Sequence, residues 1–106
     1  MQVNFEQLQD IFSDMIKDGF DIKAPLKWSF YFVDNEKSQL EKLYDELKDH
    51  DYKIERLDQN DENEWTLQVS KKEVLTPEKL HKRNIAFNEL ADYYVKLYDG
   101  WDVEKI

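Results

Sequence analysis

The side chains that could support catalysis or metal binding in this sequence are two histidines and a large number of carboxylates. His50 and His81 are the only histidines, and the chain has no cysteine. Neither histidine has a partner at the spacing of a zinc site or a catalytic triad, and a thiol nucleophile is not available. We therefore interpret both as surface histidines, and we predict no catalytic residue, no metal and no cofactor.

The densest group of carboxylates lies in the stretch "DQNDENE". When it is aligned with the calcium loop of an EF-hand, Asp58, Asn60 and Glu62 fall at ligand positions. However, Asn63 occupies the position of the required glycine, and Val69 occupies that of the bidentate glutamate. The stretch is better interpreted as a solvent-exposed hairpin loop whose negative charge is available to a basic partner.

The stretch "YDGW", near the end of the sequence, surrounds one of only two glycines. In a structural interpretation, Gly100 permits a bulge at the start of an edge strand, Tyr98 and Trp101 pack against the preceding helix, and Asp99 satisfies a backbone amide. In a functional interpretation, an exposed Trp101 beside acidic residues belongs to a protein interface. The residues favour the structural interpretation.

Composition limits the classes of function. The formal net charge is -9, with 24 acidic and 15 basic residues. Such a charge repels phosphate backbones, so we do not expect direct nucleic-acid binding and instead expect a basic protein partner. The charge is uneven, because residues 49–64 carry seven acidic and two basic side chains, whereas residues 65–88 carry two acidic and five basic ones.

The hydrophobic pattern predicts one folded domain over residues 1–106. With 41% hydrophobic and 14% aromatic residues, the chain is too apolar for a disordered acidic tail. The predicted elements, in order, are an N-terminal helix within 1–20, a strand at 26–33, a helix at 35–47, strands at 52–57 and 65–70, a helix at 77–97 and a strand from 98.

This order places a split βαβ arrangement over residues 26–106. The predicted fold class is α+β, a ferredoxin-like βαββαβ sandwich with a four-stranded antiparallel sheet and an additional N-terminal helix. Right-handed crossovers put the first and third strands in the middle of the sheet, and two helices cover one face. The N-terminal helix is expected at an end of the sheet or on part of the other face.

Three stretches of the chain resemble the regulator of ribonuclease E activity B (RraB) family. They are "MIKDGFDIKAPLKWSFYFVD", "LYDELKDHDYKIERL" and "ELADYYVKLYDGWDVEKI". The resemblance implies a small acidic, non-catalytic inhibitor that binds the scaffold region of a ribonuclease. Asp102 departs from the glycine usual after the tryptophan. The family positions present in this sequence are Gly19, Asp21, Pro25, Tyr98, Asp99, Gly100 and Trp101.

From these observations we expect a cytoplasmic protein that modulates RNA decay by contact with a ribonuclease. The sequence begins without the basic and apolar regions of a signal peptide and has no apolar run long enough to span a membrane. The residues expected to contact the partner are Asp58, Asp61, Glu62 and Glu64, with Asp99 and Trp101 as a second group.

Two alternatives remain open at the level of sequence. One is an interaction module of the same fold with a different partner, such as an immunity or stress factor, and the sequence is also compatible with a homodimer. The other is an enzyme that uses carboxylates alone, which would require two buried acidic side chains facing a pocket.

Overall fold

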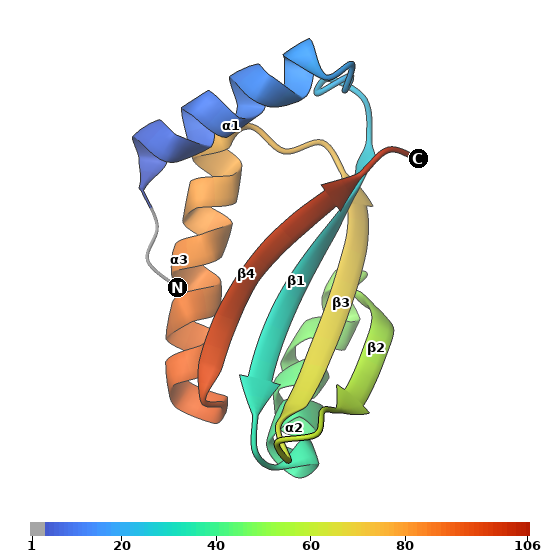
Figure 1. Ribbon diagram of the computed structural model, residues 1–106, viewed down its shortest axis with the longest axis vertical. Helices are drawn as coiled ribbons and strands as arrows, with labels where there is room; N and C mark the ends of the chain where they lie inside the picture. The colour runs from blue at the N-terminus through green and yellow to red at the C-terminus, as the bar shows by residue number, and fades with distance from the viewer. Residues whose placement is uncertain (1–3) are drawn as a thin grey trace.

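The computed structural model describes residues 4–106, and these residues form the predicted succession of helices and strands (Figure 1). The elements are α1 (Phe5–Lys17), β1 (Leu26–Asp34), α2 (Lys37–Leu47), a short 3-10 helix (Lys48–His50), β2 (Lys53–Gln59), β3 (Trp65–Glu73), α3 (Pro77–Tyr94) and β4 (Leu97–Glu104). The α+β fold with βαββαβ order and an added N-terminal helix is therefore confirmed.

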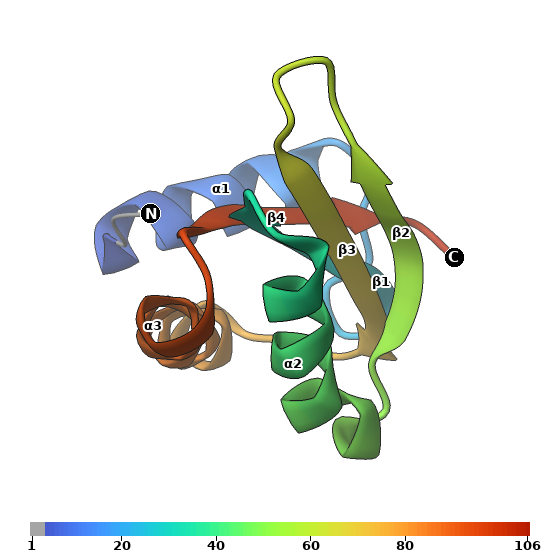
Figure 2. The same ribbon diagram turned by 90° about the horizontal axis from the view of Figure 1, so that it is seen from below.

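The four strands form one antiparallel sheet in the order β2-β3-β1-β4. β1 and β3 occupy the centre, as predicted from the right-handed crossovers of this element order. Trp28, Phe30 and Phe32 of β1 all point to one face and are fully buried. The intervening residues of β1 point to the opposite face of the sheet, which we call the open face because neither α2 nor α3 covers it (Figure 2).

α2 and α3 pack side by side on the apolar face of the sheet (Figure 2). Phe87 of α3 contacts Phe30 and Phe32 edge to face, with ring centroids 5.0 and 5.4 Å apart. Such aromatic pairs add to the hydrophobic stabilisation that comes from burying their area. Leucines at helical spacing complete this core from the two helices: Leu40, Leu43, Leu47 and Leu80.

α1 crosses the end of this layer close to the beginning of α3 (Figure 1). The Phe12 ring stacks on Trp28, with centroids 5.8 Å apart, and Phe5 lies 5.5 Å from the His81 ring. The helix therefore takes the first of the two expected positions, at an end of the sheet, and not the position on the open face. In residues 4–106, no helix is both long and apolar enough to cross a bilayer.

Capping residues define both ends of α1 and the start of α3. Asn4 Oδ1 accepts the amide protons of the first turn of α1, and Gly19 ends that helix with a φ of 89°. Thr76 Oγ1 accepts the amide proton of Lys79, with Pro77 in the first turn of α3.

The predicted ends of three elements were wrong. β3 continues to Glu73 and does not end at residue 70, and the ends of β2 and α3 also differ. β2 continues through Asp58 and Gln59, which pair with β3, so the polar loop is shorter than expected. α3 ends at Tyr94, and Leu97 already belongs to β4, where it pairs with Val33. In each case cross-strand pairing decided the conformation of residues whose type alone indicated a loop or a helix.

Candidate functional site

The predicted acidic loop is the tip of the β2–β3 hairpin, which projects beyond the body of the molecule (Figure 2). Asn60 organises the tip, because its side-chain Oδ1 accepts the amide protons of Glu62 and Glu64 at 2.9 and 3.0 Å. Its backbone amide donates to the Glu64 carbonyl, and Asn63 adopts a left-handed φ of 61°. The loop therefore has a defined conformation rather than a loose one.

The four acidic residues predicted here are close in sequence but differ in their surroundings. Asp58 lies in β2, with a carboxylate oxygen 3.4 Å from Arg56 Nε, and Glu64 forms an ion pair of 3.0 Å with Lys96, just before β4. Asp61 and Glu62 are exposed, and no basic group among residues 4–106 lies within ion-pair distance of them. The net negative charge of the tip is therefore carried by these two side chains.

The stretch "YDGW" forms a β-bulge at the other edge of the sheet. Tyr98 pairs with Phe32 and Trp101 pairs with Phe30, so four residues of β4 lie opposite three of β1. The extra residue, Asp99, and the positive φ of 110° at Gly100 make up the bulge. Without it, alternation would send Tyr98 and Trp101 to opposite faces; with it, both rings reach the helix-covered face.

Both aromatic rings of this stretch pack in the core. The Trp101 ring lies 5.7 Å from Trp28, and Tyr98 is 1% exposed. Tyr98 packs against Phe87 of the preceding helix, as the structural interpretation expects, whereas the ring contact of Trp101 is with β1. Asp99 differs from the expectation, because its exposed carboxylate accepts no backbone hydrogen bond within residues 4–106.

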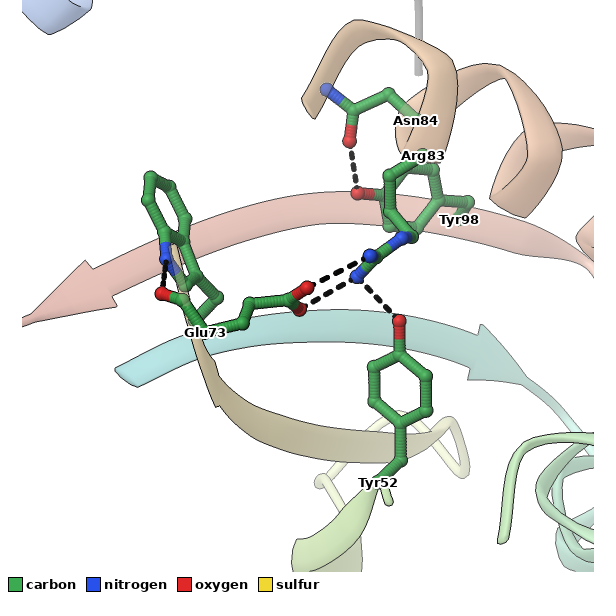
Figure 3. A network of polar contacts seen from close by, with 6 residues as sticks. Tyr52, Glu73, Arg83, Asn84 and Tyr98 are labelled. Atoms are coloured by element: carbon green, nitrogen blue, oxygen red, sulfur yellow. Dashed lines mark hydrogen bonds and ion pairs between the residues drawn. The ribbon is translucent and has the colours of Figure 1, made fainter. Parts of the chain in front are cut away.

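Behind the bulge lies a buried polar pair. The Tyr98 hydroxyl donates to Asn84 Oδ1 over 2.5 Å, and the Asn84 side chain is fully buried (Figure 3). Burial raises the pKa of Tyr98 far above that of a free phenol. Asn84 Nδ2 has no hydrogen-bond partner among the described residues, so the hydroxyl is the only group that satisfies this amide.

A second network ties α3 to the base of the hairpin (Figure 3). Both terminal nitrogens of Arg83 donate to the Glu73 carboxylate, at 2.8 and 2.9 Å, and one also donates to the Tyr52 hydroxyl. Desolvation and the nearby Glu73 together raise the pKa of Tyr52 to about 12, although Arg83 opposes this. Desolvation lowers the pKa of Arg83, but its hydrogen bonds to Glu73 and the electrostatic effects of Tyr52, Glu73 and Tyr98 together raise it overall. The bidentate geometry fixes the residues just before β2 and at the end of β3.

The structure holds few groups suited to chemistry. Among residues 4–106, no three histidine, aspartate or glutamate side chains are placed to hold a metal ion. No acidic side chain in this range is fully buried, whereas a carboxylate-only enzyme would require two. His50 is exposed, as predicted, but His81 is half-buried against Phe5, and its Nδ1 lacks a partner within the described chain.

The two groups of predicted contact residues do not form one surface. The hairpin acids belong to β2 and the turn that connects it to β3, whereas Asp99 and Trp101 belong to β4 at the opposite edge of the sheet. Of these candidates, the structure brings together only the four hairpin acids.

Comparison with protein families gives a match over almost the whole chain. Residues 5–103 match the family model described as regulator of ribonuclease activity B, or RraB. The chain belongs to the RraB family. A comparison with curated proteins found no match. Membership covers almost the whole chain, confirms the resemblance seen in the sequence and associates this fold with regulation of ribonuclease activity.

Sequence reasoning missed the polar groups inside this RraB-family fold. Asn84 follows Leu80 by four residues and precedes Phe87 by three, so the helical spacing already placed a polar side chain on the buried stripe of α3. Nothing comparable in the sequence indicated that Arg83 and Glu73 are partly buried, because arginine and glutamate side chains are usually exposed.

Proposed function

We propose that this protein is a cytoplasmic, non-catalytic regulator that binds a ribonuclease through its β2–β3 hairpin tip and so modulates RNA decay. Family membership supports the regulatory role. The single observation that supports the hairpin as contact is the pair Asp61 and Glu62, exposed at a projecting tip without basic neighbours in the described chain.

Unpaired surface carboxylates attract a basic segment more strongly than carboxylates already neutralised by an internal lysine or arginine. Asp58 and Glu64 each have such an internal partner, so we assign them a supporting role at the edge of the contact. Asp61 and Glu62 are assigned the direct contact with a lysine- or arginine-rich surface of the ribonuclease. Charge complementarity of this kind chiefly accelerates association and excludes wrong partners.

The hairpin is also suited to binding because its conformation is set before the partner arrives. Asn60 holds the tip, and the Arg83 network holds the base. A preorganised loop loses less conformational entropy on binding than a flexible one. Asp99 and Trp101 form a second proposed contact, but they lie at the other edge of the sheet and do not extend the hairpin surface.

The test is capture of the endoribonuclease that initiates RNA decay in the source organism. The immobilised wild-type protein is compared with D61K/E62K and with D10K/D14K as the matched control. Asp10 and Asp14 are exposed on α1, so the control changes net charge by the same amount at a site away from the hairpin. We expect D61K/E62K to reduce capture and the control to retain it.

The same variants are added to the purified ribonuclease with an RNA substrate. Wild type and D10K/D14K are expected to slow cleavage, and D61K/E62K to lose this effect. Raising the salt concentration should weaken wild-type capture, because exposed charges are screened over about 8 Å at physiological ionic strength. Equal capture of the nuclease by wild type and D61K/E62K would remove the hairpin from the proposal.

A further inference from the structure

A hollow of about 730 Å³ lies at the base of the hairpin, at the opposite end from the acidic tip. Strands β1, β2 and β3 line it, together with the residues that follow β4. Two acidic residues, Asp51 and Glu55, also line the hollow. The lining of what we call the lysine hollow is dominated by five lysines: Lys27, Lys53, Lys71, Lys72 and Lys105.

The positive charge of the lysine hollow is only partly neutralised from within. Glu55 accepts a hydrogen bond of 2.7 Å from the Ser70 hydroxyl and forms an ion pair of 3.2 Å with Lys27. The Ser70 bond and the nearby Lys27 keep the pKa of Glu55 below its ordinary value, so this carboxylate is charged at neutral pH. For Lys53 and Lys72, no carboxylate of residues 4–106 lies within ion-pair distance.

The sheet register brings like charges together. Lys27 of β1 is the direct cross-strand neighbour of Lys72 of β3. Like charges directly opposite each other on a sheet are destabilising. A bound anion would relieve this repulsion, so the lysine pair favours anion binding in the hollow.

Two further lysines are held in position by aromatic rings. Lys71 Nζ lies 5.2 Å from the centroid of the Tyr52 ring. Lys105 Nζ lies 5.0 Å from that of Phe20 and also donates to the Asp18 carbonyl at 3.3 Å. Cation–π contacts restrict these flexible side chains without neutralising them. Lys71 pairs with Trp28, so its side chain points to the helix-covered face, whereas the charge of Lys105 remains available to a ligand in the hollow.

We propose that the lysine hollow binds a small phosphate-bearing anion of nucleotide size. Its volume falls in the range of roughly 300–1,000 Å³ typical of small-molecule sites. Lysine ammonium groups bind phosphate as point charges, and the lining offers five of them. A small anion interacts only with the positive charge of the hollow. A long polyanion would also be repelled by the rest of the chain, whose net charge is -9.

The experiment is calorimetric titration of the full-length protein at low salt with two probes, inorganic triphosphate and ATP. Binding of both would assign recognition to the phosphates, and binding of ATP alone would add contacts to the nucleoside. The variant K53Q/K72Q removes the two lysines of the hollow that have neither an ion pair nor an aromatic contact within residues 4–106. The variant K79Q/K82Q removes two exposed lysines of α3 outside the hollow and serves as the matched control. Circular dichroism confirms that each variant is folded.

We expect wild type and K79Q/K82Q to bind with the same affinity, and K53Q/K72Q to bind about tenfold more weakly for each lysine lost. K53R/K72R, which keeps the charge, should retain most of the affinity. The proposal is overturned if wild type binds neither probe up to about 1 mM, the weak end of specific binding. It is also overturned if both glutamine variants weaken equally, or if a mixed-sequence oligonucleotide binds far more tightly and loses this affinity in K53Q/K72Q.

Discussion

The buried pair formed by Tyr98 and Asn84 allows a quantitative test of the core. Tyr98→Phe keeps the aromatic ring, with its contacts to Phe32 and Phe87, and removes only the hydroxyl. The Asn84 amide would then have lost its one hydrogen bond while remaining fully buried. Leaving a buried polar group unsatisfied costs about 1–3 kcal/mol. For a chain of this length, that corresponds to a fall in Tm of about 4–13 °C.

The second half of this test is a double-mutant cycle. Asn84→Leu alone leaves the Tyr98 hydroxyl buried without its acceptor, so it is also expected to destabilise the protein. Replacing both partners by apolar groups is close to neutral, so Y98F/N84L should be more stable than the sum of the single changes predicts, by about 1 kcal/mol or more. Urea and thermal unfolding followed by circular dichroism measure these free energies of unfolding.

Tyr93→Phe is the matched control for this cycle. Tyr93 also loses only a hydroxyl, but its side chain is 80% exposed, so its change should stay within about 0.5 kcal/mol. The reasoning is refuted if Tyr98→Phe is as harmless as Tyr93→Phe, or if the effects of the Tyr98 and Asn84 changes simply add.

Two further predictions concern backbone strain and pH. Gly100→Ala places a side chain at a φ of 110° and should lower the free energy of unfolding by about 1–3 kcal/mol; an unchanged Tm would contradict this account of the bulge. Tyr52, whose pKa is raised from 10.0 to about 12, favours the folded state fully below pH 10, and this contribution is lost as pH rises toward 12. Tyr52→Phe should therefore flatten the alkaline decline in stability measured by urea unfolding, and an identical decline in the variant would argue against it.

The elements that could be predicted from the sequence are those whose pattern depends on local chemistry. β1 and β3 were recognisable because strong β-formers alternate along them, and the starts of α1 and α3 follow Asn4 and Thr76, whose residue types favour N-caps. Gly100 indicated the bulge for a similar reason, since few other residues adopt its φ.

The features that escaped prediction depend on how distant segments meet. Lys27 and Lys72 are 45 positions apart, and only the β1–β3 register makes them neighbours. Arg83 and Glu73 pair because α3 packs over the end of β3, which neither residue type indicates. For the candidate site, the sequence located the acidic stretch, but only the structure separated the neutralised Asp58 and Glu64 from the two unpaired acids.

The hairpin thus carries opposite charges at its two ends, and their separation leads to a last prediction. β2 spans seven residues, so the tip acids lie roughly 20 Å from the lysine hollow. This distance exceeds the screening length of about 8 Å at physiological salt, so the two ends should act independently. D61K/E62K should leave triphosphate affinity unchanged while it reduces nuclease capture, and K53Q/K72Q should do the reverse. If either variant changed both measurements at that ionic strength, the acidic tip and the lysine hollow would have to be treated as one surface, most simply because the partner covers both.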